Sequence, residues 1–129
     1  MGAREDGEKF LAENAKKDYI KSTASGLQYE VLKEGNDAKP GPTDTVEVNY
    51  RGTFINGKQF DSSYDRGETI EFPLDGVIRG WTEGLQLMGV GARYRFYIPH
   101  QLAYGERGAS GVIPPYSALI FEVVLINIR

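Results

Sequence analysis

Gly80-Trp-Thr-Glu-Gly-Leu-Gln-Leu-Met-Gly89 is the one interior stretch of this sequence that departs from a two-residue alternation, and it decides the fold class. Trp81, Leu85 and Met88 fall at positions i, i+4 and i+7, which places them on one face of a short helix. Gly89 is a suitable stop for that helix. A single short helix set among alternating segments predicts an α+β domain.

Alternating segments lie on both sides of this helix and predict strands. Apolar and polar residues alternate in four segments, at 27–31, 46–50, 70–74 and 94–98. A fifth segment, 119–128, is rich in Val and Ile, which favour strands. Asn56-Gly57 signals a hairpin, because both residues tolerate positive φ. We therefore expect a twisted antiparallel β-sheet wrapped over the short helix.

The front of the chain has a different pattern, which predicts an N-terminal helix over residues 5–19 and a linker over 21–26. The expected helix has only a thin apolar stripe, made by Phe10, Leu11, Ala15 and Tyr19. Such a helix is only marginally stable in isolation, so it needs to pack against the body of the domain, another chain or an upstream segment. We therefore divide the chain into an N-terminal helix and linker, 1–25, and a domain, 26–129.

Composition excludes several classes of function. The chain has 129 residues and no cysteine, which excludes disulfides, thiol catalysis and Cys-ligated metals. A single histidine, His100, excludes a multi-His metal site within one chain, so we expect no metal and no cofactor. A net charge of −3 provides no overall electrostatic attraction to nucleic acid. Neither a membrane-spanning run nor a signal peptide is expected, which leaves the periplasm and the cytoplasm both open.

Two motifs that could carry chemistry are better explained as loops. Gly105-Glu-Arg-Gly-Ala-Ser-Gly111 is rich in glycine but lacks the Gly-Lys-Ser/Thr ending of a phosphate-binding loop. His100 has no Gly-x-Ser-x-Gly elbow to accompany it, so a hydrolase triad is disfavoured. The aromatic content is more informative, with 8 Tyr, 6 Phe and 1 Trp. As a set these rings form either a plain core or the lining of an apolar cleft, and composition leaves both open.

Five groups of motifs follow one another along residues 26–129. They are Val48-Asn-Tyr50 with Gly52 and Asn56-Gly57; Phe60-Asp-Ser-Ser63 with Asp65-Arg66; Gly76-Val-Ile-Arg-Gly-Trp-Thr-Glu-Gly84; Leu102-Ala-Tyr-Gly105; and Ile113-Pro-Pro115. In this order and spacing they resemble the FK506-binding-protein family of peptidyl-prolyl cis–trans isomerases. Phe10-Leu-Ala-Glu-Asn-Ala-Lys-Lys17 and Ser25-Gly-Leu-Gln-Tyr29 are similar to its bacterial Mip, FkpA and FKBP22 branch.

The resemblance implies a function as well as a fold. It implies an enzyme that rotates Xaa–Pro bonds, assists protein folding, binds FK506- or rapamycin-like macrolides and uses no cofactor. Its partners would be proline-containing polypeptides. In this bacterial branch a long helix joins an N-terminal dimerisation domain to the isomerase, and here only the last turns of such a helix are present. We therefore expect a monomer, and a dimer where an upstream arm exists.

The same resemblance implies a set of site residues. Trp81 corresponds to the floor under the proline ring, and the backbone N–H of Ile78 and the hydroxyl of Tyr104 to donors for ligand carbonyls. Asp61 is the one charged group of the pocket, and two interpretations stay open: it polarises the amide or anchors the site through Arg66, or it is only a structural ion pair or turn cap. The apolar walls and the closing loop are made by Tyr50, Phe60, Val77, Ile78, Phe121, Val112 and Ile113.

Two positions depart from the family pattern. Ile70 stands where many members carry an aromatic wall residue, so we expect a changed affinity more than a changed chemistry. Ala109 stands where some members carry a histidine, so no imidazole is expected to act there.

Two other hypotheses remain beside catalysis. In the first, the cleft is a non-catalytic site that holds unfolded client proteins. In the second, residues 1–25 are an interaction helix, and the partner that it binds defines the function.

Overall fold

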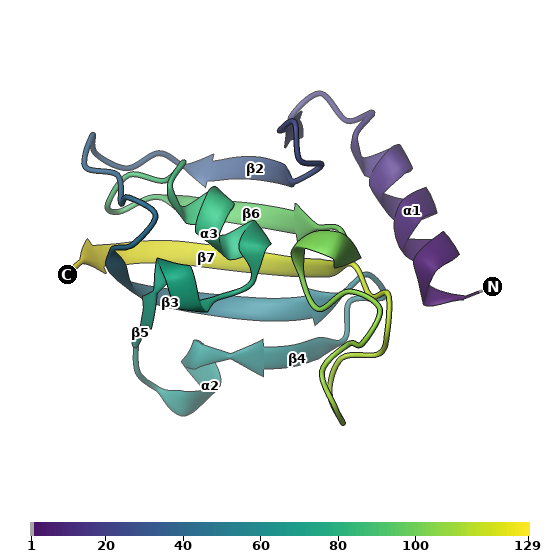
Figure 1. Ribbon diagram of the computed structural model, residues 1–129. Helices are drawn as coiled ribbons and strands as arrows, with labels where there is room; N and C mark the ends of the chain where they lie inside the picture. The colour runs from purple at the N-terminus through teal and green to yellow at the C-terminus, as the bar shows by residue number, and fades with distance from the viewer. Residues whose placement is uncertain (1) are drawn as a thin grey trace.

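The computed structural model describes residues 2–129, and its longest strands lie side by side in one sheet (Figure 1). The strands are β1 (Lys21–Ser22), β2 (Gln28–Lys33), β3 (Thr45–Phe54), β4 (Gln59–Ser62), β5 (Ile70–Pro73), β6 (Arg93–Ile98) and β7 (Leu119–Ile128). The helices are α1 (Ala3–Asn14), α2 (Ser63–Arg66) and α3 (Arg79–Leu85), with 3-10 turns η1 (Leu74–Gly76) and η2 (His100–Leu102).

The sheet is antiparallel throughout, with the order β1-β2-β6-β7-β3-β4. The edge beyond β3 is divided between two short strands. The N-terminal half of β3 pairs with β5, and its C-terminal half pairs with β4. Helix α2 lies in the break between them and leaves a gap in the edge. This break matters for function, because it brings residues from β3, β4 and β5 around one opening.

Helix α3 crosses one face of the sheet and packs on its apolar residues (Figure 1). Trp81 and Leu85 are buried there, as is Met88 in the turn that follows. Close packing depends on Gly84, since a Cβ at that position would lie 2.6 Å from the ring of Phe96. The alternating residues of β3, β6 and β7 that face this helix complete the core, so burial follows the period-two pattern.

These observations confirm the predicted fold class, an antiparallel sheet over a short helix with an N-terminal helix. The predicted hairpin at Asn56-Gly57 also forms, with a positive φ at Gly57. Two local predictions were inaccurate. The helix expected to stop at Gly89 ends at Leu85, and the next residues form tight turns. Part of the expected linker, Lys21–Ser22, pairs with β2 as β1.

The N-terminal helix also differs from its prediction. It spans Ala3–Asn14 instead of 5–19, and its buried residues are Gly7 and Asn14. Two members of the predicted apolar stripe, Ala15 and Tyr19, lie beyond the helix end and are exposed. No helix among residues 2–129 has the length and apolar character to cross a membrane.

Candidate functional site

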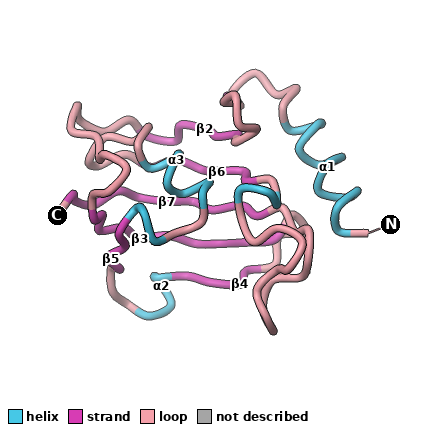
Figure 2. Tube along the Cα trace, in the orientation of Figure 1, coloured by secondary structure: helices cyan, strands magenta, loops and turns pink. Residues whose placement is uncertain are grey.

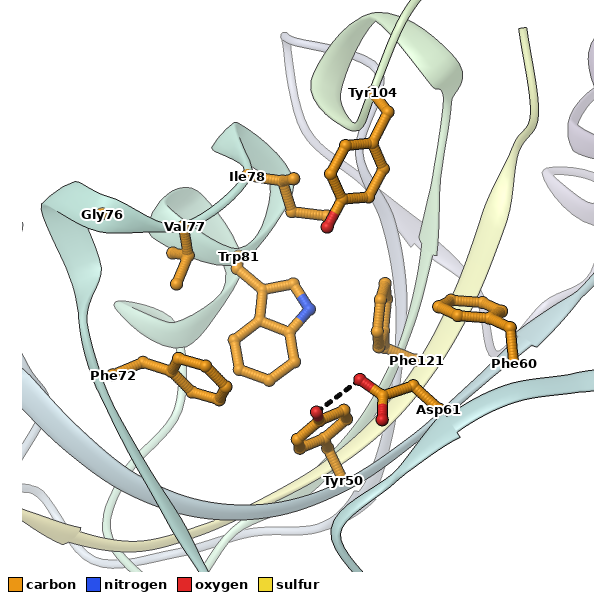
Figure 3. Close-up of a pocket in the computed structure, with 10 residues that line it drawn as sticks. All are labelled: Tyr50, Phe60, Asp61, Phe72, Gly76, Val77, Ile78, Trp81, Tyr104 and Phe121. Carbon is orange, nitrogen blue, oxygen red and sulfur yellow. Dashed lines mark hydrogen bonds between the residues drawn. The ribbon is translucent and has the colours of Figure 1, made fainter. Parts of the chain in front are cut away.

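A cavity of about 430 Å³ opens where α3, the broken sheet edge and the loop after η2 meet. Figure 3 shows its lining side chains converging on one space, and they come from β3, β4, β5, the segment from η1 to α3, the loop after η2 and β7. The lining is mostly aromatic and aliphatic, and its polar groups include the carboxylate of Asp61 and the hydroxyls of Tyr50 and Tyr104. The lining residues are Tyr50, Phe60, Asp61, Phe72, Gly76, Val77, Ile78, Trp81, Tyr104 and Phe121.

The indole of Trp81 lies at the centre of this aromatic lining (Figure 3). Three rings meet it nearly at right angles: Tyr50 at 5.3 Å, Phe72 at 5.4 Å and Phe121 at 5.4 Å between centroids. Edge-to-face contacts of this kind are favourable and directional. The indole nitrogen is buried without a hydrogen-bond partner among residues 2–129, and it points to the side where Phe121 lies. The ring of Phe121 is thus the group available to face that N–H.

The wall opposite α3 depends on a residue without a side chain. Gly52 on β3 pairs with Asp61 of β4 on one side and with Phe121 of β7 on the other. A Cβ on Gly52 would lie 2.7 Å from the Phe60 ring and 2.8 Å from the Phe121 ring. These two rings can therefore close over the backbone and meet each other edge-on at 5.5 Å.

Asp61 is held in place by three hydrogen bonds at the rim of the cavity. The hydroxyl of Tyr50 donates to Oδ2 at 2.6 Å. Nη1 of Arg66 donates to Oδ1 at 2.9 Å, and the backbone N–H of Ser62 donates to the same oxygen at 2.9 Å. Arg66 also donates from Nη2 to the Tyr50 hydroxyl at 2.9 Å, which closes a ring of three side chains.

This network sets the ionisation of its members. Burial alone would raise the pKa of Asp61, but the hydrogen bonds from Tyr50 and Arg66 and the guanidinium charge outweigh it and hold that pKa below its usual value. Burial and the hydrogen bond to Asp61 raise the pKa of the Tyr50 hydroxyl. Asp61 is therefore a carboxylate, and Tyr50 a neutral donor, at neutral pH.

The lowered pKa of Asp61 predicts how stability changes with pH. A carboxyl whose pKa is lower in the folded state stabilises the fold above its unfolded pKa, about 3.9, and loses that effect as pH falls through the folded value. We expect wild type to exceed Asp61→Asn in stability by a constant margin from pH 7 to about 5, and by a margin that shrinks progressively below. The margin should be at most about 1 kcal/mol, because the Asp61 side chain is 38% exposed.

Urea unfolding of both proteins at a series of pH values measures this margin. A margin that already shrinks above pH 5 would contradict a lowered pKa.

Most of the residues expected from the sequence line this one cavity. Those that do are Tyr50, Phe60, Asp61, Val77, Ile78, Trp81, Tyr104 and Phe121. Arg66 lies outside the lining and acts on it through Asp61 and Tyr50. Val112 is 55% exposed and Ile113 is buried, both in the loop before β7 and outside the lining.

The aromatic wall contributed by β5 is Phe72, which sequence reasoning missed. Ile70 was the expected wall residue of this strand, but it pairs with Val48 and does not line the cavity. Phe72 pairs with Val46, two residues nearer to α3, and its ring contacts Trp81. The alternation of Ile70 and Phe72 on one strand face was the available signal. Gly76, which was quoted only as part of a motif, also lines the cavity.

Comparison with known proteins points to one family. Residues 36–126 match the family described as FKBP-type peptidyl-prolyl cis-trans isomerase, and residues 2–31 match the domain amino terminal to it. The FKBP-type isomerase FkpA of Aeromonas hydrophila is 57% identical over 123 residues, which are 95% of this chain and 46% of that protein. The FKBP-type 22 kDa isomerase of Escherichia coli is 54% identical over 95% of this chain and 60% of its own length.

A solved structure gives the same result in three dimensions. The crystal structure of FkpA from Escherichia coli superimposes with a TM-score of 0.94 at 45% identity, over 98% of this chain and 59% of that chain. This chain thus spans about half the length of the curated relatives that it matches.

Proposed function

The chain belongs to the family of FKBP-type peptidyl-prolyl cis-trans isomerases, as its motifs predicted, and from this premise we propose that it catalyses rotation about Xaa–Pro bonds in polypeptides. The observation that carries the proposal is the aromatic cavity over Trp81 with polar groups at its rim. We propose residues 26–129 as the isomerase domain and 1–25 as its N-terminal helix and linker.

The reaction asks for a pocket of this kind. Amide resonance imposes a barrier of about 18–20 kcal/mol on rotation of the peptide bond. No bond forms or breaks, so the protein needs neither a nucleophile nor an external proton donor. It must bind the twisted amide more tightly than either planar form. Twisting removes conjugation and reduces the dipole of the carbonyl, so an apolar surrounding favours the twisted state over the planar ones.

The lining residues can supply these effects. In our proposal the proline ring lies on the indole of Trp81, enclosed by Tyr50, Phe72 and Phe121. The backbone N–H of Ile78, at the N-cap of α3, donates to one carbonyl of the substrate. The hydroxyl of Tyr104, whose side chain reaches over the cavity in Figure 3, donates to another. Two fixed donors would orient the chain on either side of the rotating bond.

For Asp61 we propose that it anchors the site through Arg66 and is more than a structural ion pair or a turn cap. Its oxygens already accept three hydrogen bonds from within the protein. A carboxylate so occupied holds Tyr50 against Trp81 and places a fixed negative charge beside the rotating amide. Arg66 completes the anchor and belongs to the site through it, without lining the cavity.

We further propose that the same cavity binds FK506-like macrolides and that the protein assists folding. Its volume, about 430 Å³, lies within the usual range of small-molecule sites. Isomerisation of Xaa–Pro bonds takes tens to hundreds of seconds and can limit folding, so its acceleration would help polypeptide clients.

A protease-coupled assay on an Xaa–Pro tetrapeptide tests the proposal. We expect catalysed cis-to-trans conversion that FK506 inhibits, and acceleration of a proline-limited refolding reaction. A refolding reaction whose slow phase does not involve proline is the control and should be unchanged. Absence of catalysis by a folded sample would overturn the isomerase proposal. Binding of FK506 without catalysis would favour a non-catalytic site for unfolded clients.

A further inference from the structure

We infer that helix α1 positions the loop that carries Tyr104, through Tyr116 at the base of that loop, and so tunes the isomerase reaction. This inference rests on the proposed function. The loop, called the flap here, comprises residues 103–118 and connects η2 to β7 (Figure 2). The C-terminal end of the flap, with Tyr116 and Ala118, borders α1 together with His100, which precedes the flap.

Helix α1 contacts the flap base closely along one face. Gly7 is buried, and a Cβ on it would lie 3.2 Å from the Cβ of Ala118. One turn earlier, the guanidinium of Arg4 lies over the ring of Tyr116, 5.5 Å from its centroid. These residues border a second cavity, of about 230 Å³, between α1 and the flap base. A side chain at position 7 would press on Ala118, so α1 and the flap base can approach this closely because position 7 is glycine.

Tyr116 is the residue of the flap that links this contact to Tyr104. It has a φ of 62°, the only positive φ of a non-glycine residue among residues 2–129. An L-residue adopts this conformation at a cost, so surrounding contacts must hold it. The backbone N–H of Tyr116 donates to the carbonyl of Gly105 at 2.9 Å. Its ring meets the imidazole of His100 edge-on at 5.0 Å.

His100 holds Tyr104 from the other side. Its carbonyl accepts hydrogen bonds from the backbone N–H groups of Ala103 and Gly105, both at 2.9 Å. The two neighbours of Tyr104 are therefore fixed to His100, and one of them is also fixed to Tyr116. The side chain of Tyr104 is itself 42% exposed, so these backbone bonds carry much of its placement.

The other end of α1 is fastened to the sheet, which gives the flap a fixed reference. Nδ2 of Asn14 donates to Oε1 of Gln28 on β2 at 2.8 Å, and both side chains are buried. Nε2 of Gln28 donates to the carbonyl of Leu11 at 2.9 Å. Phe10 packs near Tyr97 of β6, at 6.1 Å between centroids. A shift of α1 relative to the sheet would therefore move the flap base and, through Tyr116, change the position of Tyr104.

Substitutions at position 116 test the link. Tyr116→Gly keeps the positive φ without strain but removes the ring, and we expect kcat/KM to fall three- to tenfold, chiefly through KM. Tyr116→Phe keeps the ring, so its kcat/KM should equal that of wild type. In a Tyr104→Phe background the effect of Tyr116→Gly should disappear, because the residue acts through the Tyr104 hydroxyl. Equal effects in both backgrounds would overturn the inference.

A substitution on α1 tests the helix itself. Gly7→Leu forces α1 away from Ala118, whereas Ala12→Leu adds the same side chain at an exposed position of the same helix. We expect only Gly7→Leu to move the ring NMR signals of Tyr104, which the Tyr104→Phe variant assigns, and only Gly7→Leu to lower kcat/KM. Unmoved Tyr104 signals in Gly7→Leu would overturn the inference.

The NMR readout does not need catalysis, so it separates this inference from the proposed function. An inactive wild type whose Tyr104 signals still respond to Gly7→Leu would refute the isomerase proposal and support the link between α1 and the flap. If Gly7→Leu does not fold, the same spectra of Tyr116→Gly decide: moved Tyr104 signals support the link, and unmoved signals overturn it.

Discussion

Phe121→Ala is expected to lower kcat/KM for an Xaa–Pro peptide by about a hundredfold, the scale of loss that follows from a small misplacement of reacting groups. The ring of Phe121 contacts Trp81 at 5.4 Å and Phe60 at 5.5 Å, both nearly at right angles, and Tyr50 at 6.2 Å. Its removal leaves the indole free to tilt and opens one wall of the cavity to water. The proposed surface for the proline ring is then lost.

The same substitution should cost stability. Truncation of a buried Phe to Ala lowers the free energy of unfolding by about 3–5 kcal/mol. Phe121 is 5% exposed, so the full range applies.

Phe54→Ala is the matched control for Phe121→Ala. The ring of Phe54 packs against that of Phe60 in a tilted arrangement, at 4.9 Å between centroids, but lies outside the aromatic cavity. We expect its truncation to cost stability and to leave kcat/KM within about threefold, since it leaves the contacts of Trp81 intact. Both variants are assayed at a temperature where urea unfolding shows them folded. Equal losses of kcat/KM would mean that general destabilisation, and not the surface around Trp81, sets the rate.

Phe121→Ala, combined with Asp61→Ala, also separates catalysis from the holding of unfolded chains. An apolar cleft can retain exposed segments without stabilising a twisted amide. If the double variant still suppresses aggregation of an unfolding client but no longer isomerises a peptide, the two functions use different parts of the surface. Loss of both would place them in one cavity.

Alternation predicted the sheet well because burial on one face leaves a direct trace in the sequence. The last strand was expected over 119–128 and is β7, Leu119–Ile128.

The wall residue of β5 was missed because alternation does not show how one strand pairs with the next. Ile70 and Phe72 both point to the apolar face, and pairing with β3 decides which of them lies beside Trp81. That pairing depends on a non-local register.

The N-terminal helix shows another limit. Its contact with the domain uses Phe10 of the predicted stripe, and also Gly7 and a buried amide pair, Asn14 with Gln28. An apolar stripe reveals the first of these contacts but not those made by a glycine and two amides. The predicted stripe continued to Tyr19, but the chain leaves the helix at Ala15, turns and enters β1. Tertiary contacts override the local pattern here.

Gly89 was expected to end the helix, and the structure gives it a different role. The helix has already ended at Leu85, and Gly89 lies against the loop before β3. A Cβ on Gly89 would overlap the carbonyl oxygen of Asn36 and lie 2.9 Å from its carbonyl carbon. The neighbouring backbone is tied to the same loop, because Asn36 donates to the carbonyl of Val90 at 2.9 Å and Val90 donates to that of Ala38 at 3.0 Å.

Gly89→Ala is therefore expected to lower the free energy of unfolding by more than about 4 kcal/mol, the range reserved for severe steric or packing faults. Gly91→Ala is the control. Gly91 has a φ of 92° but nothing within 4 Å of an added Cβ, so the change should cost about 1–2 kcal/mol for conformation alone. Urea unfolding of both variants measures the difference. An insoluble Gly89→Ala beside a folded Gly91→Ala has the same meaning, whereas equal losses would show that the Asn36 loop moves aside freely.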